Sequence, residues 1–180
     1  MRSGQLVAKF SCNIACNIDS GNSNDLEAFD NNFFQWQEVS MKMSQRIAES
    51  FNRQGFLQTI GARLTKVAAG EIEIELETNP RLTQQHGYVH GAVVAAIGDT
   101  ACGYAALTMM PEDSEVVSVE YKINFMAPAK GEKLIAKGRV NKSGRTLSVC
   151  IADVFAVNDG EVKVVATILA TMMRVVAGNS

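Results

Sequence analysis

Apolar and polar residues alternate strictly from Glu71 to Thr78, with Ile72, Ile74 and Leu76 on one side and a row of glutamates on the other. A period of two is typical of a β-strand that has one buried and one solvated face. We therefore expect a half-buried strand here. Alternate carboxylates on the outer face of a strand are usually solvated, which favours that role over a cation site.

The segment from Gly91 to Met109 is nearly all Ala, Gly, Val and Ile, with Asp99 near its middle. A segment that is apolar on every side forms either a membrane span or a helix enclosed by protein. A carboxylate at the centre of a lone span would be costly in lipid, and no second apolar span accompanies it. The pattern therefore predicts an enclosed helix and no membrane association.

Strand patterns dominate the rest of the chain and are separated by short clusters of turn-forming residues. They are Val116–Phe125, Glu132–Asn141, Thr146–Val157 and Val162–Met173. Short connections favour antiparallel neighbours. One long central helix and five or more strands predict an α+β domain, with an antiparallel sheet curled around the helix.

The N-terminal third has a different pattern. Residues 17–32 are rich in Asn, Asp, Ser and Gly, so residues 1–32 are expected to form an N-terminal tail. Apolar residues at roughly helical spacing predict an accessory helix over residues 33–55, with Gly55 as its stop. The main domain is expected to span residues 56–177.

Composition narrows the class of protein. The 180 residues suit one domain, 47% of them are apolar, and 17 basic against 19 acidic residues give a net charge of −2, which disfavours nucleic-acid binding. The four scattered cysteines and the absence of an export signal predict a reduced, cytoplasmic setting. Cys12 and Cys16 are not expected to bind a metal, because no second ligand cluster accompanies them.

The block Gln84–Gly91 leads directly into the helix that carries Asp99. Free N–H groups and the positive dipole at a helix start suit a carbonyl oxygen that becomes negative during a reaction. A Gly-rich loop that merely caps a core helix is the simpler alternative. However, a carboxylate inside a Gly/Ala helix needs a partner or a task, which favours a functional role.

Gly91 and Asp99 are eight residues apart. Along one helix this separation is about 12 Å, so the two residues cannot act on one carbonyl group. If both act on one substrate, they come from two protomers of a symmetric dimer with the helices side by side. Ala95, Ala96 and Gly103 would permit the close approach of the two helices.

Three features together resemble a known family: Gln84, the G-x-x-H-G turn at Gly87–Gly91, and an acidic residue nine positions after the histidine, Asp99. The stretch Val117–Ala129 is similar to the strand and loop that follow in that family. Residues 56–175 resemble the hotdog-fold acyl-CoA thioesterases of the PaaI type, which implies a hotdog fold and a homodimer or a dimer-of-dimers homotetramer.

The resemblance implies hydrolysis of an acyl-CoA thioester to a free acid and CoA, with no further cofactor. It makes Asp99 the nucleophile or the general base, and the Gly91 N–H the oxyanion donor across the dimer interface. Gln84 would hold the thioester, His90 would orient the loop or polarise the carbonyl, and Ser118 would position water.

Two alternatives stay open. Ala92 stands where many members have a second glycine, and with the unmatched N-terminal segment it suggests a non-catalytic acyl-CoA-binding or regulatory hotdog protein. A hotdog dehydratase that uses His90 with Asp99 is a further alternative. His86 and His90 have helical metal-ligand spacing, but Gly87 interrupts them and no third ligand is evident, so no metal site is expected.

Coenzyme A carries phosphates, which charged side chains and open N–H groups in turns can bind. The candidates for this role are Lys142, Ser143, Gly144, Arg145 and Lys130. A solvated hairpin tip is the alternative interpretation. The acyl-pocket candidates are Tyr104, Met109, Met110 and Phe125, unless these side chains belong to the core.

Overall fold

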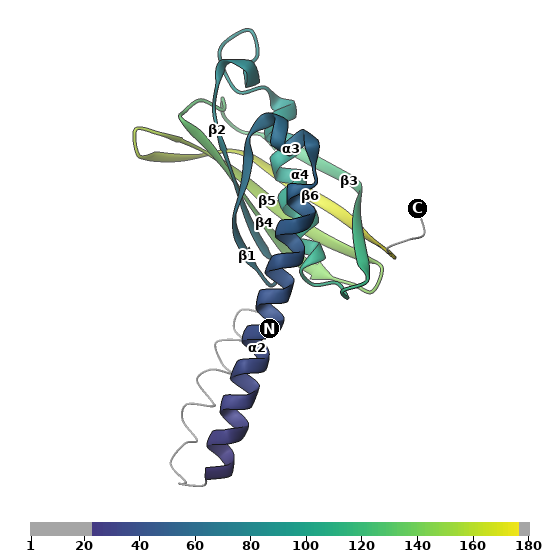
Figure 1. Ribbon diagram of the computed structural model, residues 1–180. Helices are drawn as coiled ribbons and strands as arrows, with labels where there is room; N and C mark the ends of the chain where they lie inside the picture. Colours follow the sequence, from purple (N-terminus) through teal and green to yellow (C-terminus); the bar gives the residue numbers. More distant parts are fainter. Residues whose placement is uncertain (1–22, 177–180) are drawn as a thin grey trace. The chain divides into compact units, whose positions relative to one another are not determined.

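A computed structural model of the chain describes residues 23–176 (Figure 1). The helices are α2 (Ser23–Asn52), α3 (Gly55–Ile60) and α4 (Gly91–Leu107), and a 3-10 turn, η1, spans Pro80–Leu82. The strands are β1 (Ala62–Ala68), β2 (Glu71–Glu77), β3 (Ser114–Phe125), β4 (Lys133–Ser143), β5 (Leu147–Asn158) and β6 (Glu161–Val176). The chain from Ser40 onwards forms one compact unit, and the start of α2 belongs to another.

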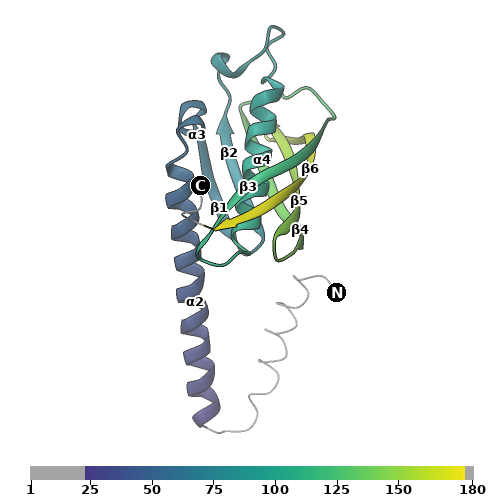
Figure 2. The ribbon, with the colours of Figure 1, turned by 90° about the vertical axis from the view of Figure 1, so that its right-hand side faces the viewer.

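The strands form one antiparallel sheet in the order β1-β2-β4-β5-β6-β3. The sheet curves around α4, as Figure 2 shows, and α4 packs against five of its strands and touches β1. Ile72, Ile74 and Leu76 of β2 are at most 1% exposed and belong to this core. The predicted α+β arrangement of a sheet curled around a central helix is therefore confirmed.

Two glycines bring α4 unusually close to the sheet. A Cβ added to Gly98 would overlap the side chain of Ile168 on β6, and one added to Gly138 on β4 would overlap the backbone of Ala101. At Gly138 the overlapped atoms are backbone, so this position has no room for a methyl group, whereas at Gly98 the overlapped atom is the tip of the Ile168 side chain. The separation of helix and sheet therefore depends most strictly on the absence of a side chain at Gly138.

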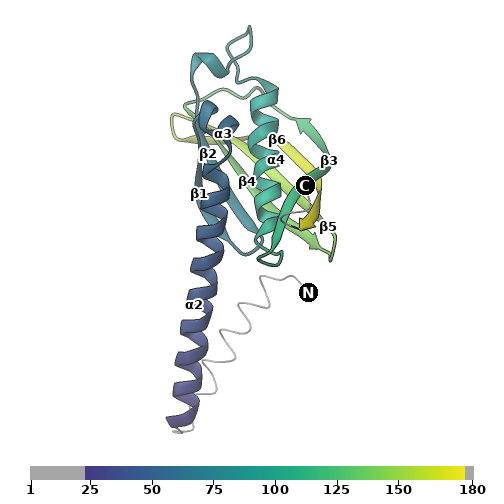
Figure 3. The same cartoon turned by 45° about the vertical axis from the view of Figure 1, so that its right-hand side comes forward.

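The order of the strands differs from the sequence-based expectation in one respect. β3 and β4 follow each other after a short connection, yet β3 pairs with β6 at one edge of the sheet, whereas β4 lies between β2 and β5 (Figure 3). Short connections favour pairing between neighbours, but residues 126–132 cross from the edge to the interior of the sheet. One edge of β3 pairs with no other described strand.

The N-terminal elements also differ from the predicted boundaries. The helix begins at Ser23 rather than at residue 33 and ends at Asn52, and Gly55 begins α3 instead of ending the first helix. Ser, Asn and Asp favour the first turn of a helix as well as loops, so composition could not separate the two. β1 was not predicted, and Cys12 and Cys16 lie outside the described residues.

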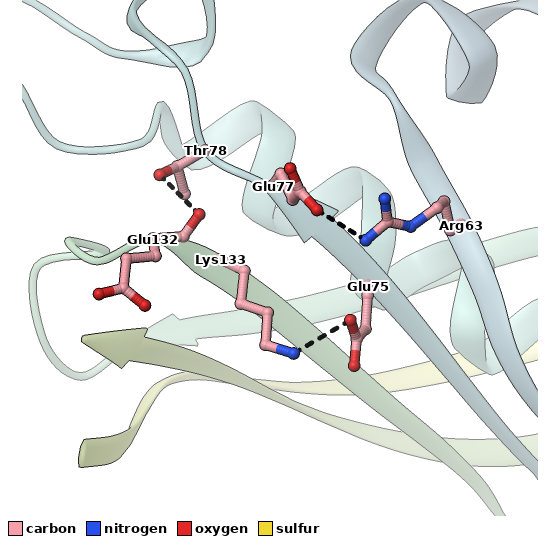
Figure 4. A network of polar contacts seen from close by, with 6 residues as sticks. All are labelled: Arg63, Glu75, Glu77, Thr78, Glu132 and Lys133. Carbon is pink, nitrogen blue, oxygen red and sulfur yellow. Dashed lines mark hydrogen bonds and ion pairs between the residues drawn. The ribbon is translucent and has the colours of Figure 1, made fainter. Parts of the chain in front are cut away.

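The outer face of β2 carries its glutamates, each in an ion pair. Figure 4 shows Arg63 with Glu77 (2.9 Å) and Lys133 with Glu75 (3.1 Å). The other two pairs are Lys66–Glu71 (2.9 Å) and Lys137–Glu73 (3.2 Å). In the described part of the chain, no helix has the length and apolar character needed to cross a membrane.

Candidate functional site

The start of α4 is organised by its N-cap residue, His90. The His90 Nδ1 atom accepts a hydrogen bond from the Ala92 N–H (3.0 Å), which caps the helix and orients the exposed imidazole. The Gly91 N–H donates no hydrogen bond to any described residue. Ala92, which departs from the family pattern, is exposed and its N–H is already occupied by His90. The Gly91 N–H is thus a free donor at the positive end of the helix.

Gln84 lies in the turn before α4. Its backbone N–H donates to the Tyr88 carbonyl oxygen (2.8 Å), and its side-chain Oε1 accepts from the His86 N–H. Gln84 and Gly91 line a cavity of about 440 Å³, called here the Gly91 cavity. The Phe125 ring closes over Gly91, because a Cβ there would lie 3.1 Å from Phe125 Cζ.

Asp99 lies further along α4 and is half-buried. The Ser118 hydroxyl on β3 donates a hydrogen bond to Asp99 Oδ1 (2.8 Å), and it also contacts Met172 Sδ (3.5 Å). Burial raises the pKa of Asp99 above its ordinary value, and the Ser118 hydrogen bond lowers it by a smaller amount. No lysine or arginine of the described residues pairs with Asp99.

A second cavity, of about 270 Å³, begins at this pair and is called here the Asp99 cavity. It extends along α4 past Gly103 to Tyr104 and Leu107, and Ser50 and Gln54 from the α2–α3 region complete it. The structure therefore brings Asp99 and Ser118 together. It places Gln84 and Gly91 in the other cavity of the same chain.

The remaining sequence candidates divide between these places. Tyr104 lines the Asp99 cavity and Phe125 the Gly91 cavity, whereas Met109 and Met110 line neither. Ala95 is buried inside the chain, so it does not lie on the outer side of α4 with the half-buried Ala96 and Gly103. In the Asp99 cavity, the lining residues that the sequence analysis missed are Ser50, Gln54, Thr100, Leu107, Glu115, Val116 and Met172.

The phosphate-binding candidates also fall into two places. Lys142, Ser143, Gly144 and Arg145 are exposed at the β4–β5 hairpin. Lys130 is exposed before the opposite end of β4, next to Ala129 of the Gly91 cavity. The length of β4 separates the two by about 33 Å, at about 3.3 Å per residue. One phosphate cannot contact both places within one chain.

The described cysteines are buried and unreactive. Cys102 and Cys150 are 0% exposed free thiols, and burial raises the pKa of Cys150 to about 11. Burial also raises the pKa of Cys102. Both behave as small apolar residues. Within residues 23–176, no three His, Cys, Asp or Glu side chains gather as metal ligands would.

Comparison with known proteins shows which protein family this chain is similar to. Residues 86–163 match the model of the thioesterase superfamily. Human acyl-coenzyme A thioesterase 13 is 30% identical over 119 residues, which cover 64% of this chain and 84% of that protein. Across seven curated relatives, the match covers 64% to 84% of the relative's own length.

Solved structures agree. A thioesterase family protein from Silicibacter pomeroyi is 41% identical, has a TM-score of 0.74, and covers 75% of this chain and 99% of that one. The PaaI protein of the Escherichia coli phenylacetic acid degradation operon, at 20% identity, shares the fold with a TM-score of 0.68, covering 76% of this chain and 96% of that one. The predicted hotdog fold and PaaI-like resemblance are confirmed.

Proposed function

The chain belongs to the thioesterase superfamily, and from that premise we propose that it is an acyl-CoA thioesterase with an active site shared between two copies of the chain. Membership supports thioester hydrolysis as the general activity, which confirms the prediction of a thioester hydrolase. The observation that carries the finer proposal is the half-buried Asp99 carboxylate, which accepts a hydrogen bond from Ser118, lines a cavity and is paired with no described cation.

The position of the two half-sites supports a dimer. Asp99 and the free Gly91 N–H are too far apart on α4 to meet one carbonyl group. A second copy, related by a twofold axis, would supply Gly91 beside the first copy's Asp99. The unpaired edge of β3 offers a place for it, since Val119 and Tyr121 are 54% and 45% exposed there. Exposed apolar residues on an unpaired strand favour association with another strand.

In the proposed reaction, the thioester carbonyl lies between Asp99 of one copy and the Gly91 N–H of the other. As a general base, Asp99 takes a proton from water while the water oxygen bonds to the carbonyl carbon. The oxyanion then accepts a hydrogen bond from Gly91. When the C–S bond breaks, its electron pair leaves on the CoA sulfur, which takes the proton from Asp99.

Asp99 can also serve as the nucleophile. It would then bond to the carbonyl carbon and release CoA, and water would open the resulting mixed anhydride. Hydroxylamine distinguishes the two routes during turnover. A hydroxamate formed on Asp99 indicates the anhydride, because only the anhydride makes the Asp99 carbonyl carbon reactive towards hydroxylamine.

The remaining sequence candidates take supporting roles in this proposal. Gln84 holds the thioester in the Gly91 cavity, and His90 keeps the helix start in place as its N-cap. Ser118 positions water as well as Asp99. The basic turn at residues 142–145 binds the phosphates of CoA, so Arg145→Ala is expected to raise KM about tenfold with little change in kcat.

Free-thiol release from a panel of acyl-CoA substrates tests the proposal. Asp99→Ala is expected to lower kcat by about a hundredfold to ten-thousandfold while binding of the CoA ester persists. Asp113→Ala is the matched control, because Asp113 is an exposed carboxylate outside both cavities. Normal turnover by Asp99→Ala would contradict the role of Asp99. Tight ester binding without any turnover by the wild type would instead indicate a regulatory binding protein.

A further inference from the structure

Ser118 has two neighbouring acceptors, and the proposed hydrolysis uses only one of them. The Ser118 Oγ atom lies 2.8 Å from Asp99 Oδ1 and 3.5 Å from the Sδ atom of Met172 on β6. A serine hydroxyl carries one hydrogen, so it donates to one acceptor at a time. An ionised carboxylate is the stronger acceptor, so the hydrogen lies towards Asp99 while Asp99 is charged. The Met172 sulfur then receives no hydrogen from Ser118.

The sheet holds the Met172 sulfur beside Ser118. Ser118 and Met172 face each other across β3 and β6, and the register of these two strands shifts between Ser118 and Glu120. Such a bulge redirects the side chains next to it. Met172 is 0% exposed and packs in an apolar cluster with Cys102 and Ala170. A side chain enclosed in this way has little freedom, so the sulfur stays within reach of the Ser118 hydroxyl.

The proposed hydrolysis alters the hydrogen bonds that Ser118 can make. Once Asp99 has taken a proton from water, it is neutral and accepts a hydrogen bond less strongly. The Ser118 hydroxyl can then turn its hydrogen towards Met172 Sδ, because a thioether sulfur is a weak acceptor. The Ser118 oxygen becomes free to accept a hydrogen bond from the new Asp99 O–H. Rotation about one C–O bond makes this exchange, and Ser118 keeps its own proton throughout.

Ser118 is exposed in a single copy of the chain. It lies on β3, whose free edge is covered by the second copy in the proposed dimer, and the acyl-CoA fills the cavity that Ser118 lines. Water other than the attacking molecule is then excluded from the Ser118 hydroxyl. This leaves Met172 Sδ as the alternative acceptor for its hydrogen.

Resting on the proposed hydrolysis, we infer that Met172 is a positioning residue of the active site, which takes the Ser118 hydrogen when Asp99 becomes protonated. By satisfying Ser118 in that state, Met172 favours the neutral form of Asp99 and makes Asp99 a better base for water. Loss of the sulfur should therefore have the opposite effect on Asp99 from loss of the Ser118 hydroxyl.

The pH dependence of kcat in Met172→Leu tests this inference. Leucine is close to methionine in volume but carries no acceptor, so the core is expected to remain folded. We expect the acidic limb of kcat to move to lower pH by about half a unit, and kcat above the limb to fall about twofold. Ser118→Ala removes the hydrogen bond to the charged form and should move the limb to higher pH. A Met172→Leu limb that stays in place or moves to higher pH would overturn the inference.

The ionisable groups near this part of α4 are left unchanged by the substitution. They are Glu115 on β3, Arg139 on β4, Cys150 and Asp153 on β5, and Cys102 and Tyr104 on α4 itself. Met173→Leu is the matched control, because Met173 is the next residue on β6, lies on the opposite face of the sheet and lines neither cavity. The control should leave the limb in place. Equal displacements in the two variants would overturn the inference.

A double variant distinguishes the hydrogen bond from packing. In Ser118→Ala, Met172 has no serine hydroxyl to accept from. Met172→Leu added to this variant should therefore leave the limb where Ser118→Ala alone places it. A further displacement would show that Met172 acts on Asp99 through packing, and would overturn the inference.

Carbon-13 NMR of the Asp99 carboxyl separates this inference from the proposed function. The titration is recorded in the presence of an S-alkyl-CoA, a thioether that has no carbonyl group to hydrolyse, and Asp99→Asn identifies the signal. If the wild type hydrolyses no acyl-CoA but Asp99 titrates at lower pH in Met172→Leu, the proposed function fails and the hydrogen-bonding role of Met172 stands. If the wild type hydrolyses acyl-CoA and neither the limb nor the titration moves, the inference about Met172 fails and hydrolysis stands.

Discussion

The two flanks of the sheet use carboxylates in opposite ways. On β2, every glutamate faces a lysine or arginine at 2.9 to 3.2 Å, on a face open to solvent. Beside β3, Asp99 is half-buried and has the Ser118 hydroxyl as its partner instead of a cation. The paired charges keep the outer face of the sheet solvated, whereas the unpaired charge costs stability and is available for chemistry.

The largest contrast should come from removing the charge on each flank. Asp99→Asn keeps the shape of the side chain and is expected to lower kcat by about a thousandfold, whereas Glu75→Gln leaves kcat unchanged. Burial raises the pKa of Asp99 in the folded state, so its stability contribution is lost as the pH rises through that pKa. At neutral pH, Asp99→Asn should therefore melt no lower than the wild type. A clearly lower melting temperature would indicate a structural role for the carboxylate.

The second contrast concerns the edge of the β3 flank. Tyr121→Asp places a charge on the proposed strand interface and should shift the dimer towards monomers, with a loss of activity of about a hundredfold. Sedimentation at several concentrations measures the dissociation. Val162→Asp is the control, because Val162 is 61% exposed on β6 and lies outside both cavities. A Tyr121→Asp dimer as stable as the wild type would place the interface elsewhere.

The third contrast is the response of Asp99 to pH. In the proposed mechanism the ionised form of Asp99 carries the reaction, so activity is expected to rise with pH through a pKa that burial raises above 3.8. The Ser118 hydrogen bond lowers this pKa, and Ser118→Ala should therefore move the acidic limb of kcat to higher pH. The loss of activity should be about tenfold larger at the acidic end than at high pH, where only the positioning of water by Ser118 is lost. If the acidic limb of kcat lies at the same pH in Ser118→Ala as in the wild type, the limb reports the titration of a group other than Asp99.

The smallest effect is expected on the β2 flank itself. The side chains of Glu75 and Lys133 are 22% and 36% exposed. Glu75→Gln breaks this ion pair and should lower the free energy of unfolding by less than about 1 kcal/mol. Urea denaturation measures this change, which should shrink further in high salt. A decrease of several kcal/mol in the free energy of unfolding would show that the Glu75–Lys133 pair contributes to the stability of the core.

Prediction from sequence succeeded where the residues left one structural interpretation. The alternation around Ile74 specified a strand, and the Asp99 carboxylate decided between a membrane span and an enclosed helix for the apolar segment around it. β1 escaped notice because Ala62–Ala68 lacks a strict alternation. The placement of β3 at the sheet edge depends on pairing with β6, which lies far away in the sequence, so no local pattern contained it.

The site was predictable to a similar degree. Spacing placed Asp99 and Gly91 on one helix and separated them, and the structure puts them in different cavities. The contact between Asp99 and Ser118 depends on the register of β3 against the helix, which one sequence does not determine. Ser50 and Gln54 carry no motif at all, and only the packing of their segment on α4 brings them to the Tyr104 hydroxyl.

The close packing at Gly138 has a consequence for how this protein can change over evolution. A carbon added at Gly138 would overlap the backbone of Ala101, two residues after Asp99 on α4, so it would displace the helix and the carboxylate together. Ser50 and Gln54 line the Asp99 cavity from another segment of the chain, away from this contact. That part of the cavity can therefore vary among descendants of this protein while Gly138 stays unchanged.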